Sequence, residues 1–148
     1  MKKEVTILIA EDDVGHAGLI RKNLGRAGIA NEIIHFLDGQ EVLDFLFRRG
    51  EGPHRTPGER YILLLDIRMP KCDGTEVLRQ VKADTELKKI PIMMITTTDD
   101  PREVEKCHAL GCNSYVTKPV EYDDFVHTIR QMGFFLAVVE IPKVNGET

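Results

Sequence analysis

The sequence has little cysteine, no run of basic residues and no apolar run long enough to cross a membrane. Its three cysteines, Cys72, Cys107 and Cys112, form no CxxC pair and are odd in number. Free thiols in a reducing cytoplasm are the simplest account of them. A net charge of −4 without a basic run argues against a nucleic-acid surface. No apolar run approaches the ~20 residues that span a bilayer, so we expect no membrane contact.

Length and composition indicate one globular domain over residues 1–148. The chain is 42% hydrophobic and 30% charged, which is ordinary for a globular protein. Residues 1–3 lead directly into a predicted strand and not into the apolar region of a signal peptide. We place the core at about 5–136, followed by a short tail at 141–148 that is too small for a second domain.

The stretch from residue 61 to residue 74 organises the rest of the chain. Its four apolar residues at 62–65 form a continuous run, which is typical of a strand buried on both faces of a parallel sheet. Asp66 follows at once, and turn residues occupy 69–74. Asp66 is therefore predicted at the carboxyl end of a central strand, where open α/β sheets bind their ligands. Taken alone, an Asp after a strand is more often a helix cap than a ligand-binding residue, and the other polar residues described below reverse that preference.

Strands and helices alternate along the chain. Strands are predicted at 5–10, 31–36, 62–65, 92–96 and 114–117, and helices at about 14–27, 39–49, 75–83, 101–110 and 122–136. This alternation implies a parallel sheet with right-handed crossovers. One long loop at 50–60, rich in Gly and Pro, is expected at the surface and in contact with a partner.

Polar side chains follow several of these strands where each one ends. Glu11 and Asp12 follow the first strand, Asp66 the third and Lys118 the fifth, while Thr96 ends the fourth. Because parallel strands end at the same edge of a sheet, these side chains are expected to converge. Clustered carboxylates repel one another unless a cation is present, and hard oxygen ligands with room for water suit Mg²⁺.

Such a site can transfer a phosphoryl group. A carboxylate such as Asp66 is a competent phosphoryl acceptor and forms an acyl phosphate. The transferred group carries spread negative charge and needs positioned positive partners. Lys118 can supply that charge, and the hydroxyl of Thr96 can donate a hydrogen bond.

On these residues the chain resembles the receiver domains of two-component response regulators over about residues 5–136. The resemblance implies a flavodoxin-like (βα)5 fold, a doubly wound parallel α/β sheet with strand order 2-1-3-4-5. It also implies that Asp66 is the phosphoacceptor, that Asp12 binds Mg²⁺ directly and that Glu11 binds it through water. The backbone carbonyl of Arg68 would complete the protein ligands, and Asp13 would cap the next helix.

The same resemblance assigns the response to phosphorylation. Thr96 and Lys118 would contact the phosphoryl group, and Tyr115 would be the switch aromatic that swings inward with Thr96. The Lys118–Pro119 peptide would be cis. Arg68 and Thr97 depart from common choices in the family and can alter phosphodonor access and phosphoryl lifetime.

The resemblance also names partners. The phosphodonor would be the phosphohistidine of a sensor histidine kinase, and output would pass to a downstream protein through phosphorylation-controlled contacts. The loop at 50–60 and the absence of an output domain resemble stand-alone regulators that work with phytochrome-like kinases.

Three other functions compete with this interpretation. A haloacid dehalogenase-type hydrolase needs a second acid two residues after the nucleophile, where this chain has Arg68. A flavin-binding protein of this fold needs a phosphate loop after the first strand, where Glu11 and Asp12 would repel phosphate. A degenerate receiver that is never phosphorylated is the third, and the five filled core positions count against it.

The last predicted helix ends in an unusually apolar run at 134–139. Two interpretations stay open. The run is covered by the tail at 141–148, or Phe134, Phe135 or Val138 lies in a homodimer or partner interface formed by the fourth helix, fifth strand and fifth helix.

Overall fold

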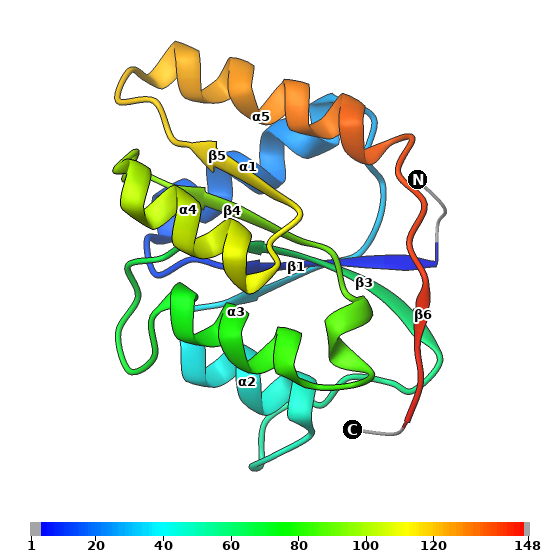
Figure 1. Ribbon diagram of the computed structural model, residues 1–148. Coiled ribbons are helices and arrows are strands. Elements are labelled where there is room, and N and C mark those ends of the chain that lie inside the picture. The colour runs from blue at the N-terminus through cyan, green and yellow to red at the C-terminus, as the bar shows by residue number, and fades with distance from the viewer. Residues whose placement is uncertain (1–3, 147–148) are drawn as a thin grey trace.

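The computed structural model describes residues 4–146, in which parallel strands alternate with helices (Figure 1). Residues 1–3, predicted to lead into the first strand, and the last two residues of the predicted tail lie outside this range. The elements are β1 Val5–Ala10, α1 Val14–Arg26, β2 Ile33–Phe36, α2 Gly39–Phe47, β3 Glu59–Leu65, α3 Gly74–Ala83, the 3₁₀ turn η1 Leu87–Lys89, β4 Ile92–Thr96, α4 Pro101–Leu110, β5 Ser114–Thr117, α5 Tyr122–Leu136 and β6 Lys143–Val144. None of the helices between residues 4 and 146 is both long and apolar enough to cross a bilayer.

The sheet has the predicted strand order β2-β1-β3-β4-β5, and these five strands are parallel. β1 and β3 pair along six positions, from Val5 with Arg60 to Ala10 with Leu65. At the other side, Thr96 of β4 pairs with Thr117 of β5. This register brings the carboxyl ends of the four strands to one edge, so the predicted fold class is confirmed.

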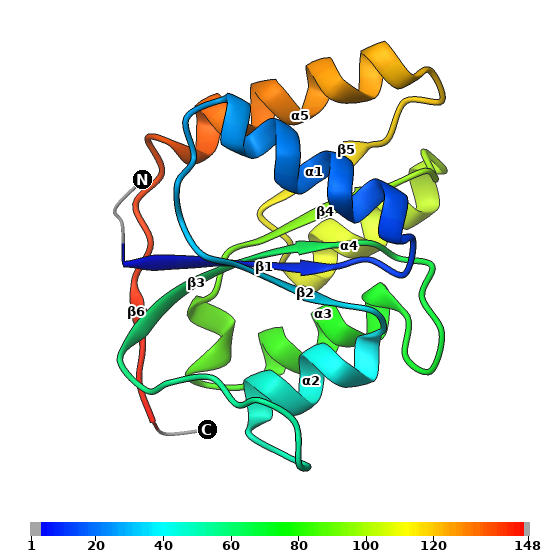
Figure 2. The same ribbon diagram turned by 180° about the vertical axis from the view of Figure 1, so that it is seen from behind.

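Helices cover both faces of the sheet. α1 and α5 lie on one face, and α2, α3 and α4 on the other (Figures 1 and 2). Alternate residues of β1 contribute to the two cores: Leu8 packs with the α2–α4 side, whereas Ile7 and Ile9 pack with α1 and α5. Burial on both faces explains why the central strands are continuously apolar.

Aspartates begin the first four helices. The side chains of Asp13, Asp38, Asp73 and Asp100 each accept a backbone N–H in the first turn. Such caps satisfy donors that have no partner within the helix, and they fix where each helix starts.

The predicted bounds of β4 and β5 are confirmed, but β2 begins at Ile33 and not at residue 31. There Asn31 donates its side-chain amide to the carbonyl of Val5, 2.9 Å away.

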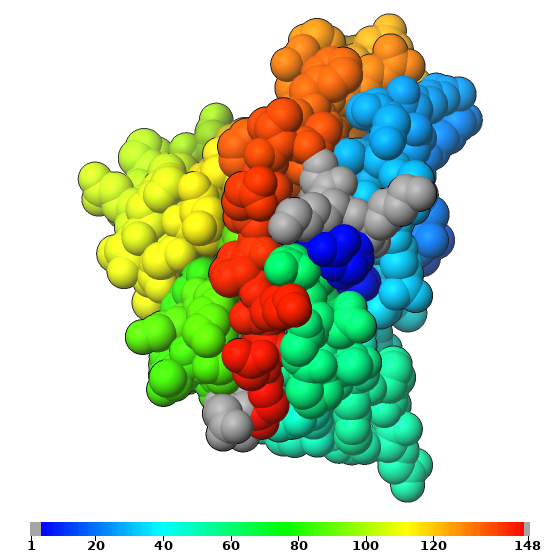
Figure 3. Space-filling model, turned by 90° about the vertical axis from the view of Figure 1, so that its right-hand side faces the viewer, coloured from blue at the N-terminus to red at the C-terminus, as the bar shows by residue number. Residues whose placement is uncertain are grey.

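The segment after α5 is not a free tail. Its residues 143–144 form β6, which pairs antiparallel with residues 59–60 of β3. Ile141 and Val144 are buried, and the segment crosses the amino-terminal end of the sheet from α5 to the opposite helix layer (Figure 3). The strand is too short to leave a periodic pattern, so the sequence predicted only a tail. Phe134, Phe135 and Val138 stay exposed, so the described part of this segment does not cover them.

Arginines from the long loop and its borders hold this segment. Arg48 donates to the carbonyl of Gly146 at 2.6 Å, and Arg60 donates to that of Ile141 at 3.0 Å. Arg55 is only 2% exposed and donates to the carbonyl of Leu46 at 2.9 Å. The expectation of a surface loop is therefore wrong at Arg55, because its guanidinium reaches under the loop to the carbonyls of Leu46 and Val144.

We expect Arg55→Met to lower the free energy of unfolding by about 1–3 kcal/mol. Methionine keeps most of the volume, but the buried carbonyl of Leu46 then lacks its donor. Urea denaturation measures the change. Arg130→Met, on the exposed side of α5, is the control and should stay within about 0.5 kcal/mol of wild type. Equal stability of the two variants would contradict the role of Arg55.

Candidate functional site

The strand register gathers the predicted site residues at one edge of the sheet. Glu11 and Asp66 are the residues that follow the paired Ala10 and Leu65. Lys118 follows β5, and its backbone N–H donates to the carbonyl of Thr96 at 2.6 Å. The site side chains therefore lie at or directly after the ends of β1, β3, β4 and β5, and no long loop is needed to bring them together.

Three carboxylates form the centre of the site. One oxygen each of Glu11, Asp12 and Asp66 lies within 4.8 Å of the others. Glu11 and Asp66 are buried and Asp12 is exposed, so the cluster opens to solvent on one side. A set of hard oxygen donors with solvent access is chemically suited to Mg²⁺, which keeps several waters when it binds to proteins.

Lys118 balances part of this negative charge. Its ammonium donates to Oε1 of Glu11 and to Oδ2 of Asp66, the latter at 3.2 Å. The other oxygen of Asp66 accepts the N–H of Ile67 at 2.7 Å, so the carboxylate is held at both oxygens. The pKa of Glu11 is raised to about 7, because burial and the charge of Asp66 raise it by more than the hydrogen bond from Lys118 lowers it. A proton or a cation is therefore readily accommodated at Glu11.

Thr96 ends β4 at this edge of the sheet, and Tyr115 lies on β5 two residues before Thr117, which pairs with Thr96. Thr96 is fully buried, and its hydroxyl has no hydrogen-bond partner within residues 4–146. An unpartnered buried hydroxyl is costly, and a group bound at the site could satisfy it. The hydroxyl of Tyr115 donates to the carbonyl of Thr98 at 2.7 Å, and burial raises the pKa of Tyr115 to about 12.

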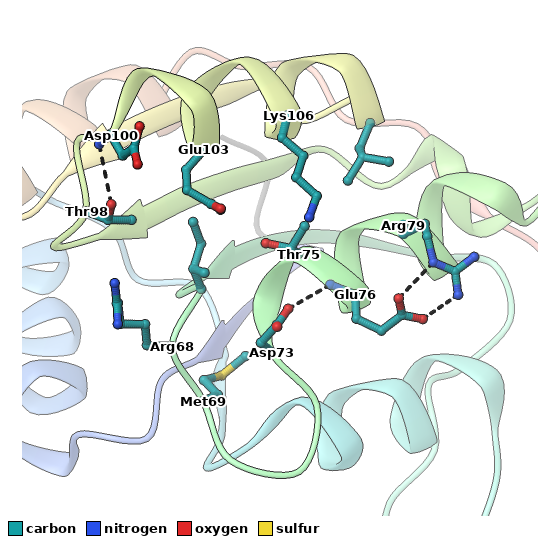
Figure 4. Close-up of a pocket in the computed structure, with 12 residues that line it drawn as sticks. Arg68, Met69, Asp73, Thr75, Glu76, Arg79, Thr98, Asp100, Glu103 and Lys106 are labelled. Atoms are coloured by element: carbon teal, nitrogen blue, oxygen red, sulfur yellow. Dashed lines mark hydrogen bonds and ion pairs between the residues drawn. The ribbon is translucent and has the colours of Figure 1, made fainter.

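The β3–α3 loop brings the start of α3 close to the end of β3, beside the site. A Cβ on Gly74 would lie 1.9 Å from the carbonyl oxygen of Asp66, so only glycine allows α3 to begin this close to the strand end. The loop also borders a hollow of about 690 Å³ between α3 and α4. Arg68 lies at one end of this hollow, and Glu103 and Lys106 point into it from α4 (Figure 4).

Two histidines in the site were not predicted. Nδ1 of His16 lies 3.2 Å from Nζ of Lys118, and Nε2 of His35 lies 2.6 Å from the carbonyl oxygen of Glu11. His16 follows the cap Asp13 by three residues, which places it in the first turn of α1 facing the same edge. That helical spacing was the available signal for His16. His35 is visible only once β2 is paired with β1.

One expectation about the backbone is wrong. All peptide bonds between residues 4 and 146 are trans, including the Lys118–Pro119 bond that was predicted to be cis. The tertiary amide before proline leaves both isomers within about 1 kcal/mol, so residue identity alone cannot choose between them. Asp13, by contrast, lies outside the carboxylate cluster and caps α1, as predicted.

Comparison with known proteins decides the family. The model of the response regulator receiver domain matches residues 7–130. The chain belongs to the response regulator receiver family. Response regulator Rcp1 of Synechocystis is 31% identical over 137 residues, which cover 92% of each chain.

Solved structures of this family share the fold. A receiver domain from Rhodospirillum rubrum is 43% identical, with a TM-score of 0.89 over 95% of this chain and 99% of that one. The Mn²⁺-bound form of Rcp1 has a TM-score of 0.83 at 31% identity, covering 93% and 98%. The phosphorylated form of RcpA, a cyanobacterial phytochrome response regulator, has a TM-score of 0.82 at 28% identity over the same shares. The resemblance to receiver domains inferred from the sequence is confirmed, and RcpA, one of the proteins that share the fold, is a phytochrome response regulator.

We expect Asp12→Ala to weaken Mg²⁺ binding by about tenfold to a hundredfold, and Glu11→Ala to weaken it less. By the resemblance to receiver domains, the first variant would lose a direct ligand and the second a ligand that acts through water. Tryptophan is absent from the chain, so calorimetry is the suitable measurement.

Asp13→Ala is the control for this comparison. It removes a helix cap next to the cluster and should affect stability more than Mg²⁺ affinity. Equal losses of affinity in Asp12→Ala and Glu11→Ala would show that the two acids do not have different roles.

Proposed function

We propose that this protein acts as a single receiver domain over residues 1–148, accepting a phosphoryl group on Asp66 from the phosphohistidine of a sensor histidine kinase. The observation that carries the proposal is the joint position of Asp66, its ammonium partner Lys118 and the acidic cluster with Glu11 and Asp12. In the transfer, an oxygen of Asp66 forms a bond to phosphorus as the bond from phosphorus to the histidine nitrogen breaks. The histidine nitrogen keeps the electron pair of that bond.

Side chains of this protein would assist the transfer in defined ways. Mg²⁺ would be held by Asp12, Asp66 and the carbonyl of Arg68, and by Glu11 through water, and would neutralise charge on the phosphoryl oxygens. Lys118 is buried beside Asp66 and can move from its carboxylate partners to a phosphoryl oxygen. The unpartnered hydroxyl of Thr96 is available as a donor to the same group.

A kinase must approach Asp66 at this edge of the sheet, and the rim there supports such a contact. Val14 at the start of α1 is 68% exposed, and Val120 and Tyr122 at the start of α5 are 100% and 58% exposed. Exposed apolar side chains around a polar site are typical of a protein-docking surface.

The phytochrome relatives favour a phytochrome-like kinase. Three free thiols are compatible with a reducing cytoplasm, where we place the protein.

Output would pass through α4, β5 and α5 to a downstream protein or a second copy of this chain. Phosphate on Asp66 would draw Thr96 inward, and Tyr115 would exchange its bond to the carbonyl of Thr98 for an inward position. On α5, Gly133 packs against α1, and Phe135 lies about 200° further around the helix. Phe135 therefore lies on the side of α5 that faces away from α1, where it is 51% exposed. This position supports a symmetric dimer through the α4–β5–α5 face.

Asp66→Asn should abolish labelling by acetyl phosphate in the presence of Mg²⁺. The amide keeps the size and an acceptor for the N–H of Ile67 but is not an anionic nucleophile. Stability should not fall, because one charge of the carboxylate cluster is removed. Mass spectrometry of the labelled wild type should find phosphate on Asp66. Label that persists on Asp12 or Asp13 in the variant would show that the acceptor is misassigned, and an unlabelled wild type would favour a degenerate receiver.

Phe135→Asp should lower the mass measured by light scattering wherever wild type is dimeric. Wild type and variant are compared with and without the phosphate mimic beryllofluoride. A charge at this position would be buried without a partner in a dimer. Arg130→Ala, on the side of α5 near α1, is the control. A wild type that is monomeric in both states, with unchanged kinase-dependent output in Phe135→Asp, would contradict the interface.

A further inference from the structure

The ammonium of Lys118 has three N–H donors, and the structure supplies three acceptors. Two are the carboxylates of Glu11 and Asp66, and the third, in the tautomer that carries its proton on Nε2, is Nδ1 of His16 at 3.2 Å. His16 thus belongs to the coordination of the one buried ammonium at the site, although it is not an acid and follows no strand.

His16 is held in this position at both its backbone and its ring. Its backbone N–H donates to Oδ1 of Asp13 at 3.1 Å, which fixes the first turn of α1. Its ring meets the ring of Phe125 on α5 edge to face, with centroids 5.3 Å apart and planes at 87°. Phe125 is itself buried, so the ring orientation is set by the packing of α1 against α5.

The three acceptors differ in what else they would do during phosphorylation. Under the proposed function, Glu11 and Asp66 would serve the metal and the phosphoryl group, so neither stays available to hold Lys118. Nδ1 of His16, which lies 3.7 Å from Oδ2 of Asp13 and 3.9 Å from Oε1 of Glu11, has no role in binding the metal or the phosphoryl group under that function. It remains the acceptor that keeps the ammonium beside the phosphoryl oxygens.

We propose that His16 is a positioning residue, whose Nδ1 holds the ammonium of Lys118 at the phosphorylation site through both transfer to and loss from Asp66. The inference rests on the proposed function. Because Lys118 would stabilise spread negative charge in both reactions, a less well held ammonium should slow both.

Two variants separate this role from simple packing. His16→Phe keeps a ring against Phe125 but has no acceptor, and His16→Asn loses the ring but places an acceptor close to the position of Nδ1. We expect His16→Phe to slow phosphorylation by acetyl phosphate with Mg²⁺, and the later loss of label, by about three- to tenfold each. His16→Asn should stay within about twofold of wild type. His127→Phe, at an exposed histidine of α5, is the control.

The opposite order of the two variants would overturn the proposal, because packing alone predicts wild-type rates for His16→Phe and a defect in His16→Asn. Equal rates in all variants would overturn it as well. Urea denaturation of each variant shows whether a rate change follows stability instead.

A second measurement does not depend on phosphorylation. An acceptor at Nδ1 requires that the neutral ring of His16 carries its proton on Nε2, and long-range ¹H–¹⁵N spectra distinguish the two tautomers. A proton on Nδ1 would overturn the assignment. If wild type shows the expected tautomer but accepts no phosphate, the proposed function fails while the contact between His16 and Lys118 stands.

Discussion

A single buried ammonium among carboxylates is the interaction on which the rest of this site depends. Lys118 follows β5, at one edge of the sheet, and contacts Glu11 after β1 and Asp66 after β3. Removing charged groups from water is costly unless opposite charges meet within the protein. The site is therefore stable only if β1, β3 and β5 end level with one another. The parallel register meets this condition.

The charge at the site is only partly balanced within residues 4–146. Lys118 supplies one positive charge against three carboxylates. Burial and the charge of Asp66 therefore still raise the pKa of Glu11, although Lys118 lowers it. The orphan hydroxyl of Thr96 is a second unsatisfied group beside the same cluster. Under the proposed function, a cation and a phosphoryl group together would meet both deficits and complete the electrostatics that the fold leaves open.

The sequence was sufficient to predict what depends on local pattern. Apolar runs located β3 and β4, Asp13 and Asp100 marked helix starts, and residues after strand ends predicted the carboxylate cluster. Contacts that depend on tertiary packing were out of reach. The pairing of residues 143–144 with β3 and the burial of Arg55 depend on chain segments far apart in sequence. The isomer at Lys118–Pro119 likewise depends on context and not on the residue pair.

The segment that crosses the sheet after α5 has a mechanical consequence for this helix. α5 is fixed at its C-terminal end, where Ile141 is buried and Arg60 binds its carbonyl, whereas Tyr122 at the other end is exposed beside the site. Buried side chains from Phe125 to Leu136 hold the rest of the helix against α1 and the sheet. The exposed apolar side chains of α5 therefore stand on a helix that is anchored along its length and also beyond its last turn.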